Sequence, residues 1–121
     1  MKSNFIFLLL LFAISCTREI SNCKIVVKNN SSISIDSVNV LSIAGVLRYK
    51  EIEPNTSVEK LVSAKPFQTS RTDGDFYFTV FVGDSIVSKS SVGYYSNGNV
   101  ASEYVVIIDE NFQIRQDAKG L

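Results

Sequence analysis

The side chains best suited to bind a ligand are gathered in one short segment, residues 94–99, which reads Tyr-Tyr-Ser-Asn-Gly-Asn. A tyrosine ring can stack on a sugar ring, and the amides of Asn97 and Asn99 can exchange hydrogen bonds with hydroxyl groups. Because Tyr94 and Tyr95 are consecutive on a predicted strand, they point to opposite faces, so at most one of them should be exposed. The segment predicts a ligand-binding loop. The alternative is a structural hairpin whose tyrosines pack at the rim of the fold.

Two pairs of carboxylates are candidates for acid–base chemistry or for cation binding: Asp73 with Asp75, and Asp109 with Glu110. A pair could act as general acid and base if an apolar pocket raised the pKa of one member. Either pair could also offer oxygen ligands to Ca²⁺, with Asp73 and Asp75 as weak metal candidates, but neither forms a complete calcium loop. Aspartate is also common in β-turns, where it bonds its own backbone. We therefore expect no catalytic residue, no metal and no cofactor.

Composition restricts the chemistry further. The 121 residues include 12 basic and 12 acidic side chains and no histidine. A net charge of zero excludes the broad basic field of a nucleic-acid-binding protein, and the chain lacks the commonest general base and metal ligand. Ser57 and Lys60 have the Ser-x-x-Lys spacing of penicillin-recognising enzymes, but that serine lies on a predicted strand and the partner motifs are absent. We expect a protein that is not an enzyme and binds no nucleic acid.

The elements that must position these residues are strands and turns, because apolar residues alternate with polar ones at a period of two. Strands are predicted over residues 24–28, 33–40 (with a kink at 36–37), 46–52, 57–62, 76–82, 85–95, 100–108 and 112–115. The strand at 76–82 is apolar on both faces, which predicts a central position in a sheet. Gly83-Asp84 and Asn97-Gly98 predict hairpin turns, and residues 63–75 have no clear period. The pattern predicts an all-β fold, a single antiparallel β-sandwich of about seven or eight strands.

One segment resembles a feature of immunoglobulin-like domains. Residues 73–77, Asp-Gly-Asp-Phe-Tyr, are similar to the approach to the tyrosine corner in those domains, although Tyr77 lies three residues after the glycine instead of two. The resemblance implies an Ig-like arrangement of the sandwich. A transthyretin-like arrangement is the alternative.

The N-terminus predicts export. Residues 5–14 form an unbroken apolar run that would span about 15 Å, half of the roughly 30 Å core of a bilayer. With one lysine before it, this run has the form of a secretory signal. Ala13-Ile14-Ser15-Cys16 then resembles the lipobox of bacterial lipoproteins, and this resemblance covers residues 1–16. It implies cleavage before Cys16 and acylation of Cys16. The alternative is an ordinary signal peptide that is cut nearby and leaves Cys16 as a thiol.

The resemblance divides the chain into a lipoprotein signal peptide (1–15), a lipidated cysteine with a tether (16–22) and a β-sandwich domain (23–121). Cys23 then has no partner within the chain, and we interpret it as a buried apolar residue, with intermolecular pairing as the alternative. Asp36-Ser37-Val38 and Asp84-Ser85-Ile86 resemble the O-glycosylation sequon of Bacteroidota.

By the lipoprotein resemblance, the protein is held at a membrane by the lipid on Cys16, and the outer membrane facing the periplasm is the expected location. The expected function is that of a non-catalytic binding or scaffold module for a protein or a glycan. An inhibitor or immunity-type protein of the cell envelope and a small carboxylate-dependent hydrolase are the alternatives. A glycan-binding role predicts an exposed Tyr94 or Tyr95, and a scaffold role predicts an exposed apolar patch or an open edge strand.

Overall fold

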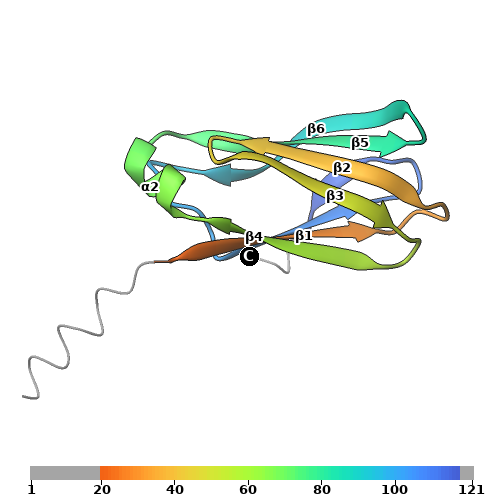
Figure 1. Cartoon of the computed structure of the whole chain (residues 1–121), viewed down its shortest axis with the longest axis horizontal. Helices are drawn as coiled ribbons and strands as arrows, with labels where there is room; N and C mark the ends of the chain where they lie inside the picture. The colour runs from red at the N-terminus through yellow and green to blue at the C-terminus, as the bar shows by residue number, and fades with distance from the viewer. Residues whose placement is uncertain (1–19, 118–121) are drawn as a thin grey trace, which may run out of the picture.

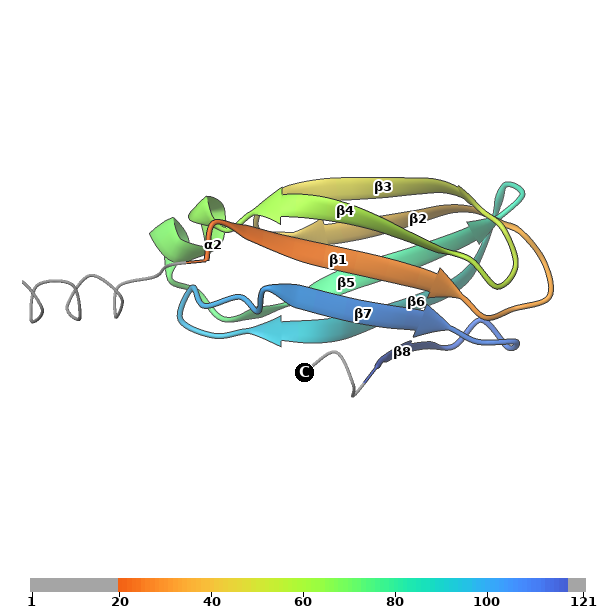
Figure 2. The same cartoon turned by 90° about the horizontal axis from the view of Figure 1, so that it is seen from below.

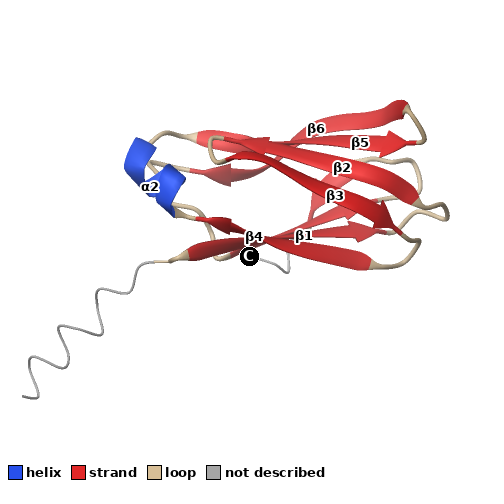
Figure 3. Ribbon diagram, in the orientation of Figure 1, coloured by secondary structure: helices blue, strands red, loops and turns tan. Residues whose placement is uncertain are grey.

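Two four-stranded sheets pack face to face in the computed structural model, which describes residues 20–117 (Figures 1 and 2). One sheet has the strand order β4-β1-β7-β8, and the other has the order β3-β2-β5-β6. Neighbouring strands are antiparallel except β1 and β7, which are parallel. The elements are β1 (Asn22–Asn29), β2 (Ile35–Ser42), β3 (Gly45–Ile52), β4 (Ser57–Ser63), α2 (Lys65–Ser70), β5 (Gly74–Val82), β6 (Ser85–Tyr95), β7 (Glu103–Ile108) and β8 (Ile114–Gln116) (Figure 3). The predicted all-β sandwich is confirmed.

The order of the strands differs from that of the immunoglobulin constant domain. There the first strand shares a sheet with the second, fifth and fourth strands of the chain, whereas β1 lies here between β4 and β7. The transthyretin-like arrangement is therefore the one that remains of the two expected. Tyr77 makes no tyrosine corner, since it lies on the outer face of its sheet and is 40% exposed. Tyr104 makes a bond of that type, because its hydroxyl donates to the Tyr94 carbonyl at 2.8 Å and accepts from the Ala101 N–H at 3.0 Å.

The period of two determines which side chains form the core. Along β5, the side chains of Phe76, Phe78 and Val80 are buried between the sheets, while Tyr77 faces outward. β5 pairs with β2 on one side and β6 on the other, so the central position predicted for this strand is confirmed. Burying each large apolar side chain stabilises the fold by about 1.5–3 kcal/mol. A slip of one residue would turn this set to solvent, and the core therefore fixes the register.

Strands β2 and β3 change their buried face together, as the kink predicted in β2 requires. Ile35 pairs with Ile52 and Val38 pairs with Tyr49, and all four side chains are buried. The two pairs are three residues apart along each strand, so the alternation breaks once between them. In β3 the break coincides with Glu51, whose φ of 54° lies in the left-handed region. The kink turns both strands while keeping their apolar side chains in the core.

Residues 63–75, predicted to be irregular, contain helix α2. Pro66 lies in the first turn of the helix, where its missing N–H costs no hydrogen bond. Phe67 is the one helix residue that is buried. Six residues are too few to show an apolar period of 3.6, which explains why the sequence pattern does not reveal the helix. Near the C-terminus, β7 begins at Glu103, later than predicted, and β8 is displaced to Ile114–Gln116.

A buried amide holds together the end of the sandwich opposite α2, which we call the far end. The Asn29 side chain donates to the carbonyls of Ile33 and Ile52, both at 2.9 Å. Its Oδ1 accepts from the backbone N–H of Ser31 at 2.9 Å and from the Ser31 hydroxyl at 2.7 Å. One side chain thus joins the end of β1, the β1–β2 loop and the end of β3. Every hydrogen-bonding position of the amide is used.

Replacing Asn29 by alanine should destabilise the protein by about 2 kcal/mol or more, because buried carbonyl and N–H groups lose their partner. Urea unfolding followed by circular dichroism measures the change. Asn111→Ala, at an exposed turn position, is the matched control and should alter the free energy of unfolding by less than about 0.5 kcal/mol. Equal unfolding curves for the two variants would contradict the structural role of Asn29.

The second cysteine lies in the core. The Cys23 side chain is fully buried at the start of β1, opposite Val62 of β4. Burial raises the pKa of its thiol to about 11. A thiol with this environment stays protonated near neutral pH and is a poor nucleophile. This placement supports the interpretation of Cys23 as a buried apolar residue rather than as a partner in an intermolecular disulfide.

Cys23 of the folded protein should therefore resist alkylation by iodoacetamide at pH 8, and should react fully once urea unfolds the chain. Mass spectrometry of the peptide that contains Cys23 measures both states. Rapid labelling under native conditions would show that the thiol is accessible and would refute its place in the core.

Candidate binding site at the helical end of the sandwich

Chain direction brings four segments to the same end of the sandwich, which we call the helical end. Asn22 at the start of β1 pairs with Ser63 at the end of β4, where α2 follows. Gly74 at the start of β5 pairs with Tyr95 at the end of β6, where the hairpin of residues 96–99 follows. The β2–β3 turn lies here as well, because β3 runs from this end to the far end. Figures 1 and 2 show α2 at the end where the described chain begins.

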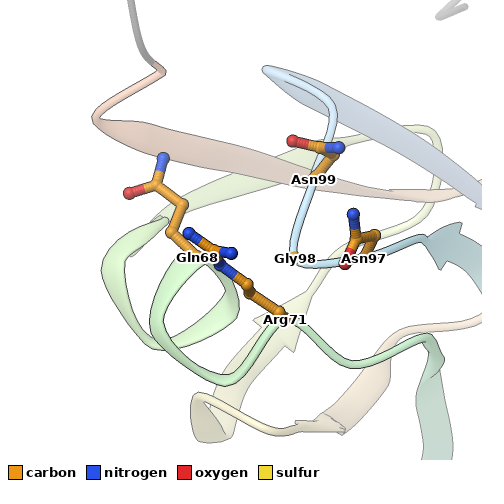
Figure 4. A pocket seen from close by; sticks show the side chains of 5 residues that line it. All are labelled: Gln68, Arg71, Asn97, Gly98 and Asn99. Atoms are coloured by element: carbon orange, nitrogen blue, oxygen red, sulfur yellow. The ribbon is translucent and has the colours of Figure 1, made fainter.

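A polar pocket of about 260 Å³ opens between α2 and the hairpin (Figure 4). Its lining residues come from these two segments: Gln68, Arg71, Asn97, Gly98 and Asn99. The two amides predicted as ligand-binding residues, Asn97 and Asn99, therefore lie at one pocket. Sequence reasoning missed Gln68 and Arg71, because they belong to the stretch without a clear period.

The hairpin is pressed against the helix at Gly98. A Cβ atom at this position would overlap with the Phe67 carbonyl oxygen and crowd the Cα atoms of Gln68 and Arg71. The backbone also has a φ of 78° here and 51° at Asn97, which suits an Asn-Gly turn. The Gly98 N–H donates to the Thr72 carbonyl at 3.2 Å. Only glycine permits the hairpin to come this close to the helix. Gly98 therefore lines the pocket where the two backbones meet.

Arg71 ends the helix and supplies the positive charge of the pocket. Its backbone is left-handed, with a φ of 53°, and its N–H caps the helix by donating to the Phe67 carbonyl at 3.0 Å. Within residues 20–117 the one salt bridge joins Lys24 and Glu59, so no carboxylate neutralises the guanidinium at contact distance. A free guanidinium can donate two parallel hydrogen bonds to a carboxylate or phosphate group.

Aromatic side chains support the pocket from inside. Phe67 of α2 packs edge-on against Tyr95 with ring centroids 4.8 Å apart, and Phe76 lies 5.5 Å from Tyr95 and 4.9 Å from Tyr104. Burial raises the pKa of Tyr104, which keeps its hydroxyl protonated for the bond to the Tyr94 carbonyl. The cluster joins α2 to both sheets, so the helix and the hairpin are held as one unit.

The two tyrosines of the predicted binding segment have different roles. Tyr95 is 6% exposed and belongs to the aromatic cluster, whereas Tyr94 is 59% exposed. The expectation that at most one would be exposed is confirmed. Tyr95 is a structural residue. Tyr94 lies three residues before Asn97 and offers its ring to solvent, but it does not line the pocket.

The carboxylates predicted as acid–base or metal candidates support turns. Asp73 accepts a 2.7 Å hydrogen bond from the Asn97 N–H and so anchors the hairpin, while Asp75 is exposed. At the far end, Asp109 accepts from the N–H groups of two residues of its own turn, both at 2.9 Å, and Glu110 accepts from the Ser32 N–H at 3.2 Å. Within residues 20–117, no three His, Cys, Asp or Glu side chains are arranged to hold a metal ion.

The remaining sequence motifs lie away from the pocket. Ser57 and Lys60 are on β4, and the Lys60 ammonium lies 5.8 Å from the centre of the Tyr49 ring. The sequon serines Ser37 and Ser85 are at the far end, near the starts of β2 and β6. Asp36 accepts a hydrogen bond from the Gly83 N–H, which draws the two sequons together. Ser85 is exposed and Ser37 is half-buried.

The outer face of the β3-β2-β5-β6 sheet carries an exposed apolar row. Val46, Leu41 and Tyr77 are cross-strand neighbours on β3, β2 and β5, and all three are exposed. The edge strand β4, in contrast, directs Lys60 toward the space between the sheets, where its neighbours Val58 and Val62 point. Inward charges on edge strands oppose pairing with another chain. Of the two scaffold features expected, the described residues therefore offer the apolar patch more readily than the β4 edge.

The lipobox, Cys16 and most of the tether lie outside the described residues. Within residues 20–117, the helix that is present is too short and too polar to cross a bilayer. The described chain starts at Ile20, whose carbonyl accepts a 2.9 Å hydrogen bond from the Gln68 side chain. Ser21 accepts another, at 3.0 Å, from the Ala64 N–H. These bonds fix the point at which the chain enters the domain beside α2.

No protein-family model and no curated protein matches the sequence. Among solved structures, a protein from Eubacterium rectale studied by NMR matches with a TM-score of 0.47 and 12% identity, over 80% of this chain and 87% of that one. Pneumolysin matches with a TM-score of 0.37 and 4% identity, over 79% of this chain and 23% of its own. A disulfide-locked mutant of intermedilysin, solved with human CD59, matches with a TM-score of 0.41 and 4% identity, over 83% and 24%. This chain spans about a quarter of the length of the last two proteins, and these likenesses assign it to no family.

Proposed function

We propose that this protein is a lipid-anchored, non-catalytic binding module of the bacterial cell envelope, and that its ligand site is the pocket at the helical end. The observation that carries the proposal is the lining of the pocket. One guanidinium and three side-chain amides line it, and no carboxylate does. Such a set donates and accepts hydrogen bonds without providing a nucleophile and a base. It suits a ligand rich in hydroxyl, carboxylate or phosphate oxygens, the groups that envelope glycans present.

The surroundings of the pocket support a glycan more than a small ion. Tyr94 exposes its ring on the strand that leads into the hairpin, and an exposed aromatic ring beside amides is a common way to hold a sugar. The carboxylates that a hydrolase would need are engaged in the turns that Asp73 and Asp109 stabilise. This use of the carboxylates favours the binding role over the hydrolase alternative.

A protein partner is the second candidate, and the exposed row of Val46, Leu41 and Tyr77 favours it. Apolar side chains that are grouped on an outer face are typical of protein contacts. An inhibitor or immunity-type protein would use such a surface. Photo-crosslinkers placed at Leu41 and at Asn99 would separate the two candidates, because a protein partner would be captured at Leu41.

The anchor is tested by the intact mass of the protein extracted from membranes, beside a Cys16→Ala variant. We expect the mass of residues 16–121 plus acyl groups for the native protein, and an uncut or soluble chain for the variant. An unlipidated native mass that the substitution leaves unchanged would refute the lipoprotein assignment.

The pocket is tested by titrating the ¹⁵N-labelled full-length protein in detergent micelles with oligosaccharides and sugar phosphates. We expect shifts in the amide signals of residues 97–99, and about tenfold weaker binding for Asn99→Ala and Arg71→Asn, each of which removes one or two hydrogen bonds to the ligand. Asparagine tolerates the left-handed backbone at position 71, so Arg71→Asn should keep the fold.

Lys89→Asn is the matched control, because Lys89 is an exposed cation in the middle of β6 and its loss should not change the affinity. Shifts confined to the far end, or equal affinities for all variants, would refute the pocket as the ligand site.

A further inference from the structure

We propose that the helical end is a membrane-docking surface, and that its pocket receives the polar headgroup of a lipid from the membrane that holds the anchor. This inference rests on the proposed lipid anchor at Cys16 and names the source of the ligand for the same pocket. It follows from where the chain enters the domain, from the length of the tether and from the side chains exposed around the pocket.

The entry point of the chain lies beside the pocket. Gln68, which lines the pocket, donates to the carbonyl of Ile20 at 2.9 Å, and Ala64 just before α2 donates to the carbonyl of Ser21 at 3.0 Å. The tether is therefore attached to the domain at α2. Figure 1 shows the described chain starting at this end of the sandwich.

The tether is short compared with the domain. Cys16 and Ile20 are four residues apart, so the chain between them can extend at most about 14 Å. Strand β1, with eight residues, is about 27 Å long and runs away from α2. An acyl group on Cys16 would therefore keep the helical end close to the headgroups, and the far end can lie up to about one strand length further from the anchor.

The side chains exposed at the helical end suit a headgroup layer. Ile20 and Ile43 expose apolar surface, and Lys65 and Arg71 are exposed cations. Arg71 has no carboxylate at contact distance among the described residues. A guanidinium with neighbouring amides can bind phosphate oxygens and headgroup hydroxyls together.

Three carboxylates also lie at this end: Asp73, Asp75 and Glu103, which starts β7 and pairs with Lys24. One oxygen of Asp73 is occupied by the Asn97 N–H, and none of the three residues lines the pocket. The helical end therefore has no excess of positive charge, and the docking depends on the pocket rather than on a basic field.

A weak site is sufficient for docking of this kind. A short tether raises the effective concentration of a tethered ligand to the millimolar range. The anchor would supply lipids to the pocket at that concentration, so a few hydrogen bonds from Arg71 and the amides are enough to orient the domain.

The chain offers a matched pair of reporter positions, because it contains no tryptophan. Ile43 lies in the β2–β3 turn at the helical end, Ile33 lies in the β1–β2 loop at the far end, and both are 44% exposed. Full-length lipidated Ile43→Trp and Ile33→Trp would each be reconstituted in vesicles of phosphatidylcholine and phosphatidylglycerol that contain a lipid with a nitroxide quencher on its headgroup. We expect at least twofold stronger quenching for Ile43→Trp than for Ile33→Trp.

A second substitution tests the pocket itself. Adding Arg71→Asn to Ile43→Trp should lower the quenching at least halfway to the value of Ile33→Trp, whereas adding Lys89→Asn should leave it unchanged. Circular dichroism would confirm that each variant keeps the fold.

The outcomes separate this proposal from the anchor on which it rests. A native chain that is unlipidated and stays off the vesicles would overturn both. A lipidated, vesicle-bound chain with equal quenching at the two positions would overturn the docking alone. Stronger quenching of Ile43→Trp that Arg71→Asn leaves unchanged would overturn the role of the pocket.

Discussion

The contact between Gly98 and helix α2 is the constraint on which the helical end of this protein depends. The hairpin joins β6 to β7 and the helix joins β4 to β5, so each crosses from one sheet to the other. Their contact closes the end of the sandwich. Because Gly98 lies against the carbonyl of Phe67, the backbones meet without side chains between them. The polar side chains on either side of the glycine are thereby left facing a common space, which is the pocket.

The two ends of the sandwich are closed by different physical means. At the far end, the amide of Asn29 satisfies backbone groups of the β1–β2 loop and of the end of β3, and it is fully buried. At the helical end, the aromatic rings of Phe67, Phe76 and Tyr95 exclude water, and the polar groups are displaced to the surface. Buried polar groups that are fully paired give rigidity and leave nothing to bind a ligand. The guanidinium and the amides that line the pocket are at the surface, where they can bind a ligand.

The alternation and the turn residues were enough to predict the sandwich, the central position of β5, the kink in β2 and the β5–β6 hairpin. Asn97-Gly98 forms the predicted turn, but the strands that it joins lie in different sheets, and the turn closes one isolated bridge. These features depend on local alternation and on turn residues such as Asn97-Gly98, which a single sequence displays directly. The sheet order could not be predicted, because the parallel pairing of β1 with β7 joins segments about eighty residues apart. Two of the five lining residues were missed for a related reason. Gln68 lies in a six-residue helix and Arg71 caps its end, and both meet the hairpin only in the packed sandwich.

The asymmetry between the ends also bears on where such a small domain exposes polar groups that are not already paired. Edge strand β4 keeps a lysine over Tyr49, whose hydroxyl donates to the carbonyl of Ile25 at 2.6 Å, so this side of the sandwich is closed by a paired polar group and a charge. An inward charge of this kind opposes the addition of a strand at the β4 edge. Only the helical end, among the described residues, combines a pocket, an unpaired guanidinium and the entry of the chain. A ligand presented at the root of the tether would meet these groups first, whereas a ligand in free solution could approach from either end.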